Sequence, residues 1–284
     1  MTAFLVTISA FSAAQGERVD YTASVDWQSQ VIEIETVVVS PARTGVRTTL
    51  EAEREAAHSL PNRTVTSVYN VQLDSLATVG ERLEEEPHIG AELLEAVSAP
   101  ELEQRYPSAD LRSVVLEHRL PLYPTVISPF IEHTRPRQPP RHIGWVPTRD
   151  FTGIVIYAAE PLPVHGTNRS TYVEPALLPE VFDNSDSMRS IITPKMLDPD
   201  MLRRWGVAAY TASPDEAPHV DRIGPTPLRL RATGAFGSTP TDLIIHEEDA
   251  NMILASPANR RLIEEGRILI ILNDSVTTGP LTSN

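Results

Sequence analysis

Polar and apolar residues alternate early in the chain. Over residues 31–39 (VIEIETVVV), Ile32 and Ile34 fall on one face while the glutamates between and after them fall on the other, which is typical of a half-buried strand. Residues 21–27 also favour a strand, and Gln28 with the serine after it supplies a turn. The pattern therefore predicts a β-hairpin.

The spacing then becomes helical. A helix is predicted over residues 43–60, ending at Pro61, because a proline disrupts the hydrogen bonding of a continuing helix. Its expected apolar stripe consists of Val46, Leu50, Ala57 and Leu60. A second helical stretch is predicted over 79–97, interrupted at Pro87, and the segment 111–120 returns to strand.

Residues 134–148 (TRPRQPPRHIGWVPT) contain four prolines and little periodicity. This composition favours an extended interdomain linker, and a proline-rich loop inside one domain is the alternative. With the linker, the predicted domains cover residues 17–133 and 149–277, followed by a polar tail over 278–284.

The second half is richer in strands. Residues 151–158 (FTGIVIYA) form a nearly continuous apolar run, as expected of a central strand buried on both faces. Further strands are predicted over 176–182, 227–233, 241–246 and 267–272. A short helix is expected after Asp198, which provides an N-cap before Pro199, and it should end at Gly206.

Two more helix starts follow, at the acidic residues 247–249 and at Ser256 with the proline after it. Helices and strands are interspersed without a regular βαβ repeat, and several strands alternate as antiparallel strands do. The predicted fold class is therefore α+β, with two mixed α/β domains and largely antiparallel sheets.

Composition narrows the function classes. The 284-residue chain is 41% hydrophobic, which suffices for a packed core. Its formal net charge of −14 disfavours nucleic acid and anionic lipid head groups as partners, unless a local basic patch exists. It has no cysteine, which excludes disulfides, thiolate metal sites and cysteine lipidation. Oligomeric state is left open.

Residues 1–16 (MTAFLVTISAFSAAQG) combine a short apolar run with small residues at a possible cleavage point. This favours a secretory signal peptide, although no basic residue precedes the apolar run, and a first β-strand is the alternative. No segment reaches the ~20 apolar residues of a membrane-spanning helix, so no transmembrane segment is predicted.

Motifs for catalysis or cofactor binding are missing: the sequence contains no nucleophile elbow, P-loop or dinucleotide glycine pattern. No catalytic residue, cofactor or metal site is predicted. The weak site candidates are His165, in an expected loop, and Asp183 and Asp186, in a segment that faintly resembles a calcium loop but also suits a polar turn. The glycines in Gly234-Ala235-Phe236-Gly237 indicate a bent strand or a turn.

Several segments of the second half resemble exported Treponema proteins described as hypothetical proteins or lipoproteins: FTGIVIYA, EPALLPEVFD, LDPDMLRRWGVAAYT, RIGPTPLRLRATGAFG and RILIILND. The first half, with VDW and VQLDSLATV, is similar to the small antigenic lipoprotein family of Helicobacter and to the N-terminal domain of the flagellar assembly protein FlgT. These resemblances imply a periplasmic or outer-membrane-associated protein. The chain departs from the lipoproteins because it has no cysteine to acylate.

The leading hypothesis is a non-catalytic envelope protein with a structural or protein-binding role, whose partner is another envelope component or a flagellar protein. A second hypothesis is a small-ligand-binding module that uses the crevice between the domains. A third is a hydrolase, which would require His165 to converge with Asp183 or Asp186 in a cleft.

Overall fold

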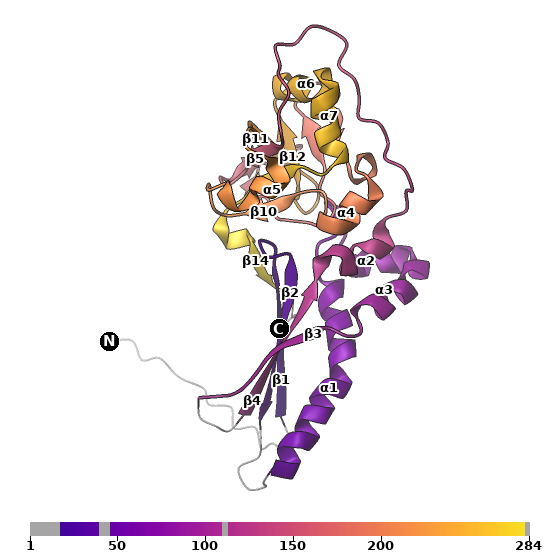
Figure 1. Cartoon of the computed structure of the whole chain (residues 1–284), viewed down its shortest axis with the longest axis vertical. Helices are drawn as coiled ribbons and strands as arrows, with labels where there is room; N and C mark the ends of the chain where they lie inside the picture. The colour runs from indigo at the N-terminus through magenta and orange to yellow at the C-terminus, as the bar shows by residue number, and fades with distance from the viewer. Residues whose placement is uncertain (1–17, 40–45, 110–112, 282–284) are drawn as a thin grey trace, which may run out of the picture.

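The computed structural model describes residues 18–39, 46–109 and 113–281, in two domains stacked along the long axis of the molecule (Figure 1). The segment predicted to be a signal peptide, residues 1–16, lies outside the described residues. The predicted α+β class with mostly antiparallel strand pairs is confirmed.

The N-terminal domain contains a five-stranded sheet in the order β14-β1-β2-β4-β3, and every neighbouring pair is antiparallel. Its strands are β1 (Arg18–Asp26), β2 (Val31–Val39), β3 (Glu101–Pro107), β4 (Ser113–Pro121) and β14 (Thr278–Pro280). The hairpin of β1 and β2 is as predicted, and Asp26 Oδ1 holds its turn by accepting from the backbone N–H of Gln28 at 2.9 Å.

One face of this sheet is covered by helices. The helical segments of the domain are α1 (Val46–Tyr69), α2 (Val79–Glu85), η1 (Pro87–Ile89), α3 (Gly90–Val97), η2 (Leu122–Val126) and η3 (Ser128–Phe130). Ile32 and Ile34 of β2 point into the core while Glu33 and Glu35 are exposed, so the alternation predicted the buried face correctly.

The predicted end of the first helix is wrong, because α1 continues through Pro61 to Tyr69. An interior proline costs about 3 kcal/mol, but the last turns bury Val68 fully in the core. Thr64 and Ser67 donate their hydroxyls to carbonyls four residues earlier. Packing therefore overrides the local signal. Of the expected stripe, Leu60 packs against the core as predicted, whereas Ala57 is exposed and its neighbour Ala56 is buried.

The second domain contains a seven-stranded sheet in the order β10-β13-β5-β11-β12-β8-β9. Its strands are β5 (Ile154–Tyr157), β8 (Val181–Asp183), β9 (Ser190–Ile192), β10 (Ala209–Thr211), β11 (Leu228–Phe236), β12 (Asp242–Ile245) and β13 (Ile268–Ile271), and a separate ribbon joins β6 (Leu162–Pro163) to β7 (Ser170–Thr171). The first four strands in spatial order run parallel, a feature that the sequence pattern did not predict.

The apolar run around β5 is central, as predicted, and its residues are buried on both faces. Ile154 and Ile156 face the large core with α4, α6 and α7, whereas Val155 packs with Ile223 of α5 on the opposite side. The helical segments are η4 (Pro194–Met196), α4 (Pro199–Trp205), η5 (Ala217–His219), α5 (Val220–Ile223), α6 (Glu247–Ala255), α7 (Pro257–Glu264) and η6 (Asp274–Val276).

Local capping signals in this half were read correctly. Asp198 Oδ1 accepts from the backbone N–H of Asp200 at 2.9 Å and α4 ends before Gly206. Gly234 lies in β11 at a shift of the strand register, as expected of a bent strand. The strand predicted over 176–182 is wrong for most of its length, because only residues from Val181 onward pair with β12.

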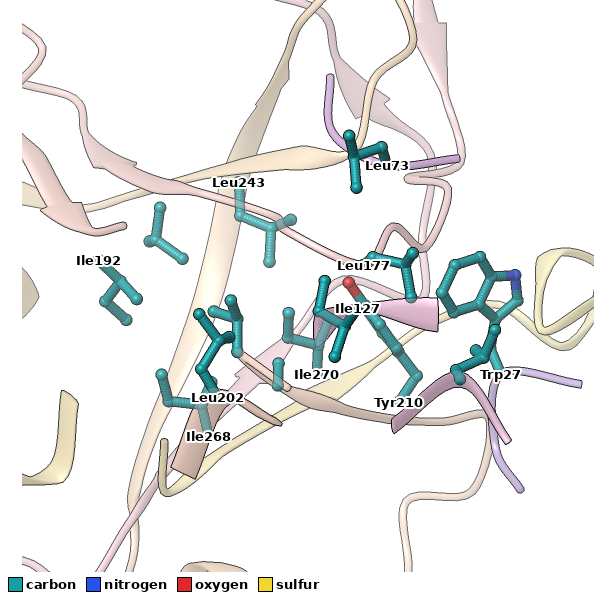
Figure 2. Close-up of a cluster of buried hydrophobic side chains, with 14 of the residues drawn as sticks. Trp27, Leu73, Ile127, Leu177, Ile192, Leu202, Tyr210, Leu243, Ile268 and Ile270 are labelled. Carbon is teal, nitrogen blue, oxygen red and sulfur yellow. The ribbon is translucent and has the colours of Figure 1, made fainter. Parts of the chain in front are cut away.

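A continuous apolar core joins the two domains (Figure 2). Trp27, at the end of β1, lies edge-on to Tyr210 of β10, with ring centroids 5.8 Å apart. Both residues belong to the same buried cluster as Leu177 and Ile127. The domain boundary is therefore part of the apolar core of the protein.

The C-terminal strand also crosses this boundary. We predicted a polar tail from residue 278, but Thr278–Pro280 form β14 and pair with β1 of the N-terminal sheet. The backbone N–H of Leu281 donates to the Ala23 carbonyl at 2.8 Å, and Leu281 itself is buried. The tail prediction failed because polarity alone does not reveal a free sheet edge that accepts a strand.

Residues 134–148 contain no helix or strand and run over the second domain as an extended strap (Figure 1). The backbone N–H of Arg137 donates to the Lys195 carbonyl at 2.7 Å, and Thr148 Oγ1 donates to the Met252 carbonyl at 3.1 Å. The segment that connects the domains is thus attached to the second one. Among the described residues, no helix is long and apolar enough to cross a bilayer.

We expect Leu177→Ala to lower the free energy of unfolding by about 2–5 kcal/mol, because it leaves a cavity in the core shared by both domains. Urea unfolding followed by circular dichroism should show one earlier cooperative transition. Leu102→Ala, on the exposed strand β3, is the matched control and should change stability by less than about 0.5 kcal/mol. Separate transitions of the two domains would contradict the shared core.

Candidate functional site

A crevice of about 1240 Å³ lies where the two domains and the strap meet. The N-terminal domain contributes the loop from Leu73 to Leu76 and part of α2. The chain from Phe130 to Pro140, which includes the start of the strap, forms another wall. The second domain contributes β8, β9 and the segment after β9. The hypothesis of an interdomain crevice thus corresponds to a real cavity.

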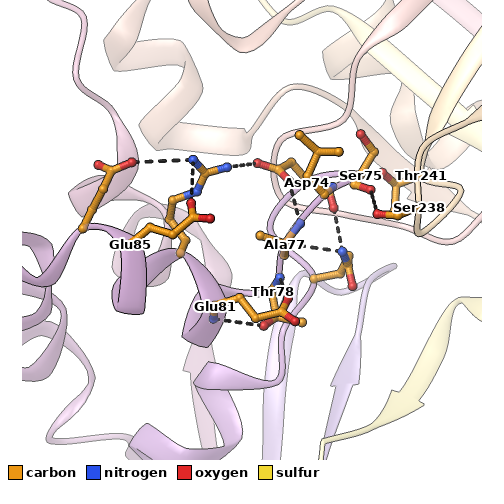
Figure 3. A network of polar contacts seen from close by, with 12 residues as sticks. Asp74, Ser75, Ala77, Thr78, Glu81, Glu85, Ser238 and Thr241 are labelled. Carbon is orange, nitrogen blue, oxygen red and sulfur yellow. Dashed lines mark hydrogen bonds and ion pairs between the residues drawn. The ribbon is translucent and has the colours of Figure 1, made fainter.

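The Leu73–Leu76 loop forms one wall, and Ser238 of the second domain donates its hydroxyl to the Ser75 carbonyl of this loop at 2.9 Å (Figure 3). Leu178 donates its backbone N–H to the Leu73 carbonyl at 2.7 Å, and Thr239 donates to the Ser75 carbonyl at 3.2 Å. Gly237 has a φ of +114°, and a Cβ there would lie 2.4 Å from the Cβ of Ser75. Only glycine therefore permits this close approach.

Asp74 shapes the same loop. One carboxylate oxygen accepts from the backbone N–H groups of Leu76 and Ala77, and the other binds Arg82 of α2 at 2.7 Å. α2 itself begins with a capping box in which Thr78 and Glu81 each bind the other's backbone N–H. The loop and the helix after it are consequently fixed before any ligand arrives.

Two carboxyl groups of the second domain lie close together beside this wall. The backbone N–H of Glu180 donates to Asp242 Oδ1 at 2.9 Å. Burial, reinforced by the charges of Asp242 and Asp74, raises the pKa of Glu180 to about 7. Burial likewise raises the pKa of Asp242 to about 6, against the opposing effect of its hydrogen bonds.

The remaining lining is mixed in character. Cationic side chains come from the strap and the second domain, and they include Arg137, Arg189 and Lys195. Apolar side chains include Ile89 and Leu76, and Leu76 is 72% exposed in spite of its size. A surface of this kind can bind groups of either charge together with an apolar side chain.

The predicted site residues lie elsewhere. His165 is exposed and its ring centroid is 6.0 Å from that of Phe236. Asp183 is fully buried and accepts hydrogen bonds from Ser185 and Arg189, which lower its pKa in spite of burial. Asp186 is exposed on the same turn.

None of the three predicted residues lines the crevice, and Asp183 uses its hydrogen-bonding capacity to close its own turn. Within the described ranges there is also no group of three or more metal-type ligands that could hold a metal ion. The crevice residues Asp74, Glu180 and Asp242 were missed because they are far apart in the sequence and match no motif.

Two family models match the chain. Residues 18–129 match the N-terminal domain of Treponema pallidum Tp0624, and residues 153–274 match the second domain of that protein. The chain belongs with a Treponema-type family. No curated protein matches it. The two matched regions are the two domains described above, and the strap lies between them.

Protonation of the crevice carboxyls should affect stability. Because the pKa of Glu180 is raised in the folded protein, its protonated carboxyl contributes to the free energy of unfolding. This contribution is fully present below pH 4.5 and is lost as pH rises through about 7. Glu180→Gln, which stays uncharged, should therefore be more stable than wild type at pH 8 by roughly 1–3 kcal/mol and similar to it at pH 4.5.

Urea denaturation at both pH values measures this difference. Glu101→Gln, on the exposed strand β3, is the control for loss of one negative charge. Equal stability gains for the two variants at pH 8 would indicate a general charge effect and not the crevice environment.

Proposed function

We propose that this chain is a non-catalytic, exported protein of the cell envelope that binds a segment of another envelope protein in the crevice between its domains. The observation that carries the proposal is the crevice itself, at about 1240 Å³ and lined by both domains and the strap. Pockets for small molecules usually measure about 300–1,000 Å³, so this space suits a peptide segment better.

The lining supports a protein ligand. Leu76 presents an apolar side chain that is 72% exposed on the crevice lining, where a bound segment could bury it. Lys195 and Glu180 add charges of both signs nearby, as at polar interface rims. The preformed wall keeps the entropic cost of binding low.

Export and a flagellar partner rest on the resemblances of the sequence. The apolar residues 1–16 support export, and the likeness to Treponema lipoproteins supports an envelope location. The flagellar association has the narrowest support, since it depends on the FlgT likeness of the first half alone. A hydrolase gains no support from His165, Asp183 and Asp186, which do not meet in a cleft.

The partner can be sought by affinity capture from Treponema envelope fractions, followed by titration of the purified partner. We expect the combined variant Leu76→Asp and Lys195→Glu to weaken binding at least tenfold, because it removes an apolar contact and reverses a charge. The matched control, Leu102→Asp with Arg261→Glu, changes exposed sites outside the crevice. Equal binding by the two variants would refute the crevice as the site.

A small ligand is the second candidate, because the carboxyls of Glu180 and Asp242 both line the crevice and could hold a cationic group. Thermal unfolding with a panel of metabolites should then show stabilisation that rises with ligand concentration. Asp242→Asn should reduce this stabilisation, whereas Glu101→Gln should leave it unchanged. A ligand that stabilises all three proteins equally would bind elsewhere.

A further inference from the structure

The strap displays the most exposed large apolar side chains in the described part of the protein. Ile143 is 96% exposed and Trp145 is 88% exposed. They flank Gly144, whose φ of +151° lies in a region that favours glycine. Exposed residues of this size in a soluble domain commonly mark a surface that contacts something else.

The same segment is locally cationic in an acidic protein. Residues 134–149 contain four arginines and no carboxylate, while the whole chain has a net charge of −14. The exposed arginines are Arg135, Arg137, Arg141 and Arg149. No carboxylate of the described residues pairs with them, so their charges are available to an outside anion.

The strap is held in place on both sides of the exposed pair. Before it, the backbone of Arg137 is bound to Lys195, and after it Thr148 is bound to Met252. Asn259 also donates to the Arg149 carbonyl at 2.9 Å. The segment arches past α6 at one end of the molecule (Figure 1), so a flat surface can reach it without meeting the N-terminal domain.

We propose that this strap docks on a bilayer surface rich in anionic phospholipids. Tryptophan favours the interfacial layer of a bilayer, and isoleucine gains by leaving water there. Arginines beside them attract anionic head groups, each strengthening binding by about fivefold near the surface. A nucleic acid would bind the strap through its phosphates and would leave the exposed Ile143 side chain in water. A lipid surface can accommodate both the arginines and this apolar side chain, so it is the better match.

The test uses the full chain and vesicles of phosphatidylcholine in which about one lipid in three is the anionic phosphatidylglycerol. We expect co-sedimentation with these vesicles, little with phosphatidylcholine alone, and loss of binding at high salt. Tryptophan emission should shift to shorter wavelength on binding. Trp145 would cause this shift, because Trp27 is only 4% exposed and Trp205 is partly buried, with its indole N–H bound to the Glu265 carbonyl.

Two variants separate the contributions of the strap. Ile143→Ser with Trp145→Ser, and Arg141→Gln with Arg149→Gln, which leave the crevice residue Arg137 unchanged, should each weaken binding at least tenfold. Both should keep the melting temperature of the wild type, since the altered side chains are exposed. The control Arg169→Gln with Arg261→Gln removes the same charge from other exposed sites that form no ion pair with the described residues.

Several outcomes would overturn the proposal. Undiminished vesicle binding by both strap variants would assign the interaction to another part of the chain, such as the apolar residues 1–16. Equal losses in the strap arginine variant and its control would indicate general electrostatics. Absence of binding at low salt, or tighter binding to an acidic protein or nucleic acid than to vesicles, would also refute it.

Discussion

The Leu73–Leu76 loop, together with Gln72 before it, is bound along its main chain by the second domain. Leu177 and Leu178 bind it on one side and Thr239 binds it on the other. Buried main-chain groups need such partners, because an unsatisfied one is costly in a site removed from water. Since this loop belongs to the N-terminal domain, its hydrogen bonds fix the relative position of the two domains. The crevice exists in a defined shape because of that constraint.

Aromatic packing extends the same constraint over the whole boundary. Tyr123 lies against Gly206, where a Cβ would come within 2.4 Å of the ring, and its hydroxyl donates to the Leu177 carbonyl at 3.4 Å. Tyr210 donates to the Ala176 carbonyl at 2.8 Å. Burial raises the pKa of both tyrosines, so the hydroxyls remain protonated donors. The domains therefore behave as one packed body and not as two bodies on a flexible linker.

Patterns confined to a few neighbouring residues were readable from the sequence. The alternation around Ile32, the N-cap at Asp198 and the apolar run of β5 each depend on local spacing, and each predicted its element. The end of α1 was predicted wrongly at Pro61, because the burial of Val68 outweighs the cost of a proline inside the helix. The parallel strand order and the pairing of β14 depend on contacts between distant segments, which no local period encodes.

The crevice was beyond sequence reasoning for the same reason. Asp74 and Asp242 acquire their significance from the meeting of two domains, and neither belongs to a recognisable motif. By contrast, Asp183, which the sequence suggested as a site residue, lies in an acidic turn. Its carboxylate accepts hydrogen bonds from Ser185 and Arg189 of that turn. A polar cluster that is local in sequence tends to satisfy itself through short-range hydrogen bonds. Glu180 and Asp242, which lie far apart in the sequence, instead meet beside the crevice with raised pKa values, so a site in this protein is better sought at the junction of its domains.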